Sequence, residues 1–344
     1  MRRLGLIAIM AAISWTVSCR LIDGLRGQAV CKTLSGLTRR QQDSCRRHPD
    51  LTLAAVEGLS AAATECQHQF RWHRWNCSSL AVRAPHNSHI LARGFRESAF
   101  AHAITAAAVA ERVARACASG RVLECGCGPE RGAAGAGWKW GGCSHNIRTG
   151  LAFSQEFLDV KESNNGDIQS RVSLHNNEAG RLAVAKKMEV KCKCHGVSGS
   201  CELRTCWRSA PDLRTIGVAL KERFREAIMV EESNKGGGGL AVRRRRKKKK
   251  KRRKRPRDLR GSLLYYEKSP SFCEPVPGLE AGGTTGRICK KGGRGVDGCA
   301  SLCCGRGYNI IRRRLVDRCN CKFHWCCYVT CSNCTVDEWI TVCK

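Results

Sequence analysis

Residues 191–207, KCKCHGVSGSCELRTCW, place four cysteines around a short polar loop. Cys192 and Cys194 are two residues apart, so on a strand their side chains share one face. That face can meet a returning strand that carries Cys201 and Cys206. We expect nested disulfides, Cys194–Cys201 and Cys192–Cys206, which would hold a hairpin closed near its tip.

The loop between these cysteines, residues 195–200, contains two serines and two glycines. Gly196 and Gly199 permit the positive φ angles that a tight turn requires. We therefore expect Ser198 to lie exposed at the end of a stiff arm, where its hydroxyl is available for chemistry.

Three interpretations of this loop compete. A zinc site would draw its ligands from Cys192, Cys194, His195 and Cys201. A serine hydrolase would show G-x-S-x-G, but Ser200 stands where the second glycine should follow Ser198, and no acid–base partner is evident. Because an oxidising compartment favours disulfides over zinc, we assign no metal ligand and no catalytic residue. The third interpretation is a structural turn with incidental serines.

The first residues indicate the compartment. Two arginines precede an apolar stretch, residues 4–17, that is too short to span a bilayer, and small residues before Cys19 offer a cleavage site. We predict a signal peptide over residues 1–19 and a secreted protein, with a short N-terminal anchor as the alternative. The chain has 25 cysteines, and removing Cys19 leaves an even number, so we expect the others to pair as disulfides.

The charge balance indicates an anionic partner. The chain has 61 Lys and Arg against 29 Asp and Glu, a net charge of +32. Every residue of 243–257, which we call the basic segment, is Lys or Arg except Pro256. For a secreted protein such a field favours acidic glycans or anionic membrane surfaces, whereas the signal peptide argues against nucleic acid.

The pattern along the chain predicts an α+β, disulfide-rich fold. An N-terminal helical domain, residues 20–232, carries the cystine-braced hairpin of residues 191–207. Its apolar periodicity and capping residues predict helices over about 50–70, 95–118 and 213–228.

The rest of the chain has a different character. Residues 233–260, a glycine run followed by the basic segment, cannot bury apolar surface and should form a flexible linker. Residues 261–344 are dense in cysteine and poor in aliphatic side chains. We expect a small β-hairpin domain held by disulfides rather than by an apolar core. Within it, KFHWCCYVT alternates as a hairpin does.

Seven segments, spread in order over nearly the whole mature chain, closely resemble the Wnt family of secreted morphogens. They are ECQHQFRWHRWNC, WKWGGCSHNI, HNNEAGR, CKCHGVSGSC, SPSFC, CCGRGYN and CNCKFHWCCYVTC. CHGVSGSC and SPSFC favour the Wnt-nine-like branch of that family. The resemblance implies a secreted developmental signalling ligand of the extracellular space and matrix, with no enzymatic activity.

The resemblance also implies that Ser198 is esterified with a monounsaturated fatty acid by an acyltransferase of the endoplasmic reticulum. It implies no other cofactor. The lipid-bearing loop would enter the cysteine-rich domain of a Frizzled receptor, and an LRP-type co-receptor would be bridged to it. A dedicated membrane carrier would be needed for the lipid-bearing protein to leave the cell.

A second receptor contact is implied on the C-terminal hairpin. By position it maps to Phe323, Trp325, Cys326, Cys327 and Val329, with a vicinal disulfide between the two cysteines. Rigid aromatic rings lose little entropy on binding, so the aromatic pair suits a binding hot spot. In the alternative, Phe323 and Trp325 cover the neighbouring disulfides locally.

The remaining disulfides follow the family pattern. They are Cys66–Cys77, Cys117–Cys125, Cys127–Cys143, Cys273–Cys304, Cys289–Cys299, Cys303–Cys343, Cys319–Cys334 and Cys321–Cys331. Cys31 and Cys45 are left over and are paired with each other. Asn76 and Asn333 begin N-glycosylation sequons, each with cysteine at its centre, which makes them poorer acceptors.

The basic segment departs from the family pattern, and it puts the detail of the nearby co-receptor contact in doubt. We expect it to bind heparan sulfate. The expected contacts include Arg243, Arg246, Lys250, Arg253 and Arg255. Its sequence RRKR is also a protease target, and a solvated linker without a ligand is the third interpretation.

The rival to a lipid-modified ligand is a disulfide-rich matrix protein that holds glycans by charge and carries no lipid. A secreted lipid hydrolase is a more distant third. An acyl group on Ser198 would distinguish the first from the other two.

Overall fold

The structure is a computed structural model, and the predicted signal peptide, residues 1–19, lies outside the part that it describes. The described residues are 31–32, 34, 37–80, 88–129, 139–160, 166–232, 240–243, 259–325 and 327–344. They form two compact units, which we call the helical unit and the cystine unit. The helical unit contains Ser79–Ser269 and the chain before Phe70, and the cystine unit contains Phe70–Ser78 and Pro270–Lys344.

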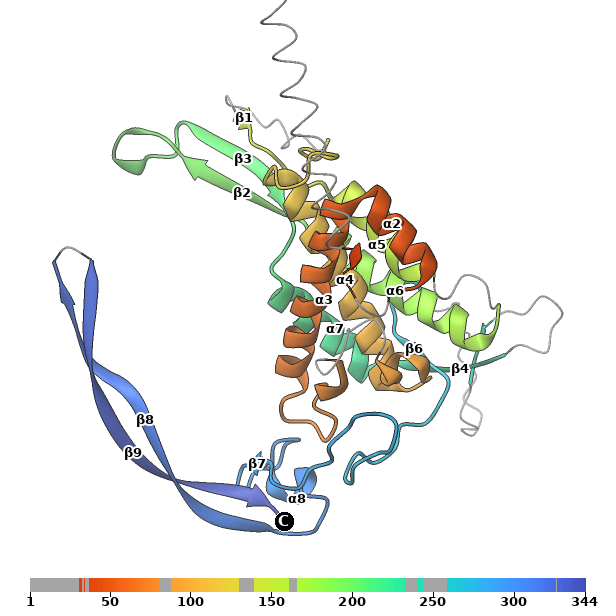
Figure 1. The fold of residues 1–344 in the computed structure, drawn as a ribbon, viewed down its shortest axis with the longest axis vertical. Helices are drawn as coiled ribbons and strands as arrows, with labels where there is room; N and C mark the ends of the chain where they lie inside the picture. The colour runs from red at the N-terminus through yellow and green to blue at the C-terminus, as the bar shows by residue number, and fades with distance from the viewer. Residues whose placement is uncertain are drawn as a thin grey trace, which may run out of the picture. The chain divides into compact units, whose positions relative to one another are not determined.

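The helical unit is built mainly from α-helices, with short 3₁₀ turns between them (Figure 1). Its α-helices and the 3₁₀ turns near its start are α2 (Arg39–Arg47), α3 (Pro49–Phe70), η1 (Ser78–Leu80), η3 (His89–Ala92), α4 (Arg96–Ala118), α5 (Ile147–Asp159), α6 (Ile168–Lys186) and α7 (Leu213–Arg225). In the described ranges, no helix combines the length and the apolar character that a bilayer crossing would require.

Helix α4 forms the centre of this unit. It is buried on nearly all sides, as its alanine-rich sequence allows, and α5, α6 and α7 pack against it. A methyl group added at Gly180 of α6 would lie 1.9 Å from the carbonyl oxygen of Ala103. Because only glycine permits that approach, α6 lies directly against the backbone of α4. This close packing fixes α5 and α6, the two helices next to the base of the hairpin described below.

A small sheet corrects two of the predictions. Ile228 does not continue the third predicted helix, which ends at Arg225, but begins β4 (Ile228–Glu232). The backbone N–H of Ile228 donates to the carbonyl of Leu263 (2.9 Å). Part of the predicted flexible linker is also ordered, because β5 (Leu240–Val242) pairs antiparallel with β4. These residues are apolar and suit a strand, unlike the glycines before them.

The segment after the linker belongs to the helical unit rather than to the C-terminal domain in which the sequence places it. β6 (Leu264–Tyr265) pairs parallel with β4. The side-chain amide of Asn176 donates to the carbonyl of Leu264 and accepts from its N–H, each at 2.9 Å. The HNNEAGR segment thus supplies the residue that holds this strand in place.

The cystine unit contains the expected β-hairpin. Its elements are β7 (Ile288–Cys289), α8 (Cys299–Leu302), β8 (Tyr308–His324) and β9 (Tyr328–Cys343), with β9 between β7 and β8. Its buried cluster consists of cysteines around Leu302, as expected for a unit without an apolar core. Phe70–Ser78 joins this unit because the Arg287 guanidinium donates to the carbonyls of Arg71 (2.9 Å) and Arg74 (2.7 Å).

Candidate functional site

The stretch 191–207 forms the predicted hairpin. β2 (Glu189–Cys194) pairs antiparallel with β3 (Arg204–Ser209), and β1 (Lys139–Gly141) lies parallel to β3 on its other side. Within the helical unit the two strands extend away from the helices (Figure 1). Cys192 lies opposite Cys206 and is bonded to it, and Cys194 is bonded to Cys201. Two nested disulfides therefore clamp this arm, which we call the lipid hairpin after the acyl group that the sequence predicts on Ser198.

The base of the lipid hairpin is anchored to the segment that leads into α5. The backbone N–H of His145 donates to the carbonyl of Arg208 (2.8 Å), and its Nδ1 accepts from the N–H of Ala210 (3.0 Å). Burial, reinforced by the charges of Arg115 and Lys191, lowers the pKa of the His145 imidazole. The ring is therefore neutral at extracellular pH, which leaves Nδ1 free to accept this bond.

The tip is a turn that is held by hydrogen bonds between its own backbone groups. Gly199 N–H donates to the carbonyl of Gly196 (3.0 Å), and Gly196 N–H donates to the carbonyl of Ser200 (2.9 Å). Ser198 lies in the left-handed region, with φ 54° and ψ 26°, and is exposed. Val197 beside it is 90% exposed. A non-glycine residue in this conformation is uncommon, so the turn holds the serine in an unusual and specific backbone geometry.

The two serines of the loop differ in their surroundings. A methyl group added at Gly196 would lie 1.9 Å from Ser200 Oγ and 2.6 Å from the Ser200 carbonyl oxygen. The Ser200 hydroxyl thus lies against Gly196, whereas Ser198 stands at the apex of the turn. Both residues are exposed, so the difference between them lies in this contact of the Ser200 side chain.

Sequence reasoning missed one bond that supports the tip. The His195 imidazole Nε2 lies 2.9 Å from Thr205 Oγ1, across the hairpin. His195 N–H also donates to the carbonyl of Leu203 (2.7 Å). The antiparallel register of the two strands could have revealed this pair. Because the imidazole is bonded across the arm, its role in the structure is to brace the loop.

The zinc interpretation has no support in this geometry. The three cysteines that it needs, Cys192, Cys194 and Cys201, are bonded as disulfides and offer no thiolate. The sulfurs of Cys289, Cys299 and Cys303 also lie within 4.8 Å of one another, but each belongs to a disulfide. An exposed, rigidly presented serine hydroxyl is what the lipid hairpin offers.

Gly196 provides a test of the tip geometry. We expect Gly196→Ala to lower acylation at Ser198 several-fold, because the added methyl group forces the Ser200 carbonyl outward and disturbs the turn. The measurement is incorporation of an alkyne-bearing fatty acid in producing cells, normalised to the amount of protein. Gly126→Ala is the matched control, since an added methyl group there meets nothing within 4 Å. Equal labelling of the two variants would show that the turn does not govern acylation.

The second predicted site is the tip of the long hairpin in the cystine unit. Phe323 lies opposite Val329, and His324 lies opposite Tyr328. The exposed fractions are 71% for Phe323 and 92% for Trp325. These values argue against the alternative in which the two rings cover the disulfides. Two disulfides clamp the strands behind the tip, Cys319–Cys334 and Cys321–Cys331.

At Cys327 the structure contradicts the predicted vicinal disulfide. Cys327 is a free, exposed cysteine, and its predicted partner Cys326 lies outside the described residues. Neighbouring Cα atoms are about 3.8 Å apart, closer than the usual disulfide range of about 4.4–6.8 Å, so such a bond requires strain. Sequence reasoning also missed the stacked rings of His324 and Tyr328, whose centroids are 4.8 Å apart. This stack stiffens the tip.

The structure also forms five further bonds of the family pattern. They are Cys117–Cys125, Cys127–Cys143, Cys273–Cys304, Cys289–Cys299 and Cys303–Cys343. The bond Cys31–Cys45, which was paired by elimination, is present as well. Cys66 and Cys77 are each disulfide-bonded as well. Disulfides therefore reinforce the packed helices of the chain before β1 and provide much of the core of the cystine unit.

The sequons and the basic segment differ in how far the structure describes them. Asn76 is half-buried and its Oδ1 accepts from the N–H of Ser78 (3.2 Å), whereas Asn333 is exposed on β9. Arg243 forms an ion pair with Glu231 (3.9 Å). Arg246, Lys250, Arg253 and Arg255 lie outside the described residues. Glycosylation and glycan binding stay predictions.

Comparison with known proteins agrees with these observations. The model of the Wnt family matches residues 33–344. Mouse Wnt-3a is 46% identical over 321 residues, and human Wnt-3a is 45% identical over 321 residues; each match covers 92% of this chain and 89% of the relative.

A solved structure of human WLS in complex with WNT8A also matches. The similarity has a TM-score of 0.61 at 32% sequence identity, and it covers 85% of this chain and 94% of the matched chain. The Wnt-nine-like assignment within the family stays a prediction. The α+β, disulfide-rich fold is confirmed, and the chain belongs to the Wnt family, whose members are secreted signalling ligands rather than enzymes.

Proposed function

We propose that this chain is a Wnt-type ligand that carries a monounsaturated fatty acyl group on Ser198. The observation that carries the proposal is the position of this residue, exposed at the apex of a turn that two nested disulfides clamp. The acyl donor is a fatty acyl thioester. The Ser198 hydroxyl attacks the carbonyl carbon, the ester C–O bond forms, and the thiol leaves with the proton.

A rigid arm makes the acyl group effective in binding. Each buried methylene contributes about 0.8 kcal/mol, so a dozen methylenes supply on the order of 10 kcal/mol before the entropic costs of association. Those costs are lowest when the chain is presented on a preorganised support. The disulfides Cys192–Cys206 and Cys194–Cys201 provide that support.

The expected receptor is the cysteine-rich domain of a Frizzled protein. The acyl group would enter an apolar groove on that domain, and the aromatic tip of the β8–β9 hairpin would provide a second contact. Trp325 and Phe323 are large, exposed and held on a clamped hairpin, which are the properties of binding hot spots. An LRP-type co-receptor would bind the same ligand, and signalling would follow from the enforced proximity of the two receptors.

Secretion of such a ligand requires a carrier, because an exposed acyl chain would hold the protein to membranes. The similarity to the matched chain in the structure of human WLS in complex with WNT8A supports a carrier of that kind for this protein. We propose that the acyl group on Ser198 is what the carrier shields.

The acyltransferase provides the experiment that tests this function. Protein made in cells with and without active acyltransferase of the endoplasmic reticulum is compared for binding to a purified Frizzled cysteine-rich domain. We expect protein from the deficient cells to be folded and to bind at least about 1,000-fold more weakly, the loss of about 4 kcal/mol. Equal affinity of the two preparations would refute the proposed function.

The basic segment is proposed to bind heparan sulfate at the cell surface. We expect a variant with residues 244–257 replaced by a neutral Gly/Ser linker to elute from heparin at clearly lower salt, because these exchanges remove most of the local positive field. Arg313→Gln with Arg318→Gln, on β8, is the control for a general loss of charge. An unchanged elution position for the linker variant would reject the idea. The intact mass of the secreted protein shows whether RRKR is cleaved instead.

A further inference from the structure

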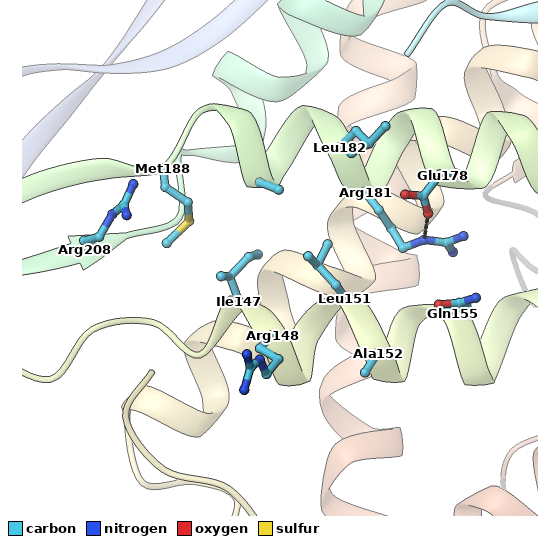
Figure 2. Close-up of a pocket in the computed structure, with 11 residues that line it drawn as sticks. Ile147, Arg148, Leu151, Ala152, Gln155, Glu178, Arg181, Leu182, Met188 and Arg208 are labelled. Carbon is cyan, nitrogen blue, oxygen red and sulfur yellow. Dashed lines mark hydrogen bonds and ion pairs between the residues drawn. The ribbon is translucent and has the colours of Figure 1, made fainter. Parts of the chain in front are cut away.

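A cavity with apolar walls lies away from the tip of the lipid hairpin. A cavity of about 480 Å³ opens between α5 and α6, next to the point where β2 and β3 meet the helices (Figure 2). This volume is within the range of small-molecule sites. Its walls are mostly aliphatic, from Ile147, Leu151, Ala152, Leu182, Ala185 and Met188.

At one end of the cavity the guanidinium group is already paired. Arg181 is buried there, and its guanidinium bonds Asp159 (2.8 and 3.1 Å) and Glu178 (2.9 Å). Figure 2 shows Gln155 and this ion pair with Glu178 at the same end. Because this one guanidinium is bonded to two carboxylates, that end offers no unpaired cation to a ligand.

The other end is cationic. Figure 2 shows Arg208 and Met188 there, and Arg148 on the neighbouring first turn of α5. Arg148 is exposed and forms no ion pair with any residue in the described part of the chain. The N-terminus of α5, a helix of 13 residues that starts at Ile147, adds a partial positive charge at the same place.

An aliphatic slot with guanidinium groups at one end is complementary to a chain with an anionic head. We propose that this cavity binds a single-chain anionic lipid non-covalently, with its carboxylate or phosphate at Arg148 and Arg208 and its alkyl chain along Leu151 and Leu182. The site is separate from the proposed acyl group. Ser198 lies beyond the far end of β2 from Met188, and the six residues of that strand alone span about 20 Å.

The site has a consequence for the lipid hairpin. Arg208 belongs to β3, and Met188 directly precedes β2. A ligand held between them and α5 would contact both strands at their base. Occupancy would therefore stiffen the joint from which the arm projects.

Photolabelling of the full-length protein tests the site. Producing cells receive a fatty acid that carries a diazirine and an alkyne, and the purified protein is irradiated, denatured and treated with alkaline hydroxylamine, which removes ester-linked chains. We expect light-dependent, hydroxylamine-resistant adducts on peptides from α5 and α6. Adducts scattered over many surfaces, or absent, would overturn the proposal. Label on Ser198 is light-independent and hydroxylamine-sensitive, so the proposed function and this inference can fail separately.

Variants test the two halves of the site. We expect Leu182→Glu to lower the resistant labelling at least five-fold, whereas Val218→Glu, on the exposed face of α7, leaves it unchanged. Arg148→Glu, an exposed position, should lower labelling by the carboxylate probe about five-fold and leave labelling by the matching alcohol unchanged. This second variant keeps the test decisive if Leu182→Glu is not secreted. Equal loss with both probes would contradict the anionic head.

Competition identifies the head group. Excess oleate should displace the probe if the site prefers a carboxylate, and excess lysophosphatidic acid should displace it if the site prefers a phosphate. Displacement by either supports the proposed chemistry. Displacement by neither, with cross-links to a co-purified protein instead, would show that the cavity is a protein-docking groove and would overturn the lipid proposal.

Discussion

Ser198→Ala is expected to leave the fold intact, remove the acyl group, and lower affinity for the Frizzled cysteine-rich domain by at least about 1,000-fold, equivalent to about 4 kcal/mol. The side chain is exposed and alanine keeps the backbone, so the expected cost in stability is below about 0.5 kcal/mol. The measurements are thermal unfolding, receptor affinity and a reporter of Wnt signalling. Carrier-dependent secretion should fall as well.

Ser200→Ala is the matched control for this prediction. Ser200 has the same side chain two residues away, but its hydroxyl lies against Gly196. We expect the control to keep acylation and signalling near the level of the unchanged protein. A fully active Ser198→Ala protein, or equal losses in the two variants, would contradict the role given to Ser198.

Trp325→Ala should produce the second large effect. Trp325 is 92% exposed, so its removal should not affect the fold, whereas truncation of an aromatic hot spot costs about 2–3 kcal/mol, or roughly 30- to 150-fold in affinity. Affinity for the isolated Frizzled domain is the measurement. Acylation should be unchanged, because Ser198 belongs to the other unit.

Val316→Ala, on the same hairpin, controls for a general effect of removing an exposed apolar side chain. Val316 is 65% exposed and lies on β8 at a distance from the tip. Its substitution should change receptor affinity less than three-fold. If Trp325→Ala also changes affinity by less than three-fold, the aromatic tip is not a receptor contact.

The lipid hairpin could be predicted because its information is local. Alternate cysteines specify the face of the strand, and the glycines specify the turn. The left-handed backbone of Ser198 has no such signature, because serine is not a residue that this conformation favours. The bond between His195 and Thr205 depends on the strand register, which the predicted Cys192–Cys206 disulfide implies, but sequence reasoning did not use it.

Segments whose place depends on distant partners were predicted less well. Ile228 fits the apolar periodicity of α7, but its hydrogen bond to Leu263 draws it into a strand. Leu240–Val242 follows a glycine run and is ordered because β4 offers it an edge. Phe70–Ser78 joins the cystine unit through Arg287, more than 200 positions later in the chain.

The cavity between α5 and α6 illustrates the same limit. Leu151 and Leu182 appear in the sequence as ordinary core positions of two helices, and nothing in their spacing shows that the space between them is unfilled. Close packing of Gly180 against Ala103 sets the position of α6 relative to α4, and the cavity follows from that arrangement.

Mass spectrometry of the peptide that contains position 198, from protein secreted by producing cells, tests the central claim most directly. A single ester-linked monounsaturated acyl adduct on that serine, in the fraction that activates the receptor, is the predicted result. Fully active secreted protein with an unmodified hydroxyl at this position would contradict the account.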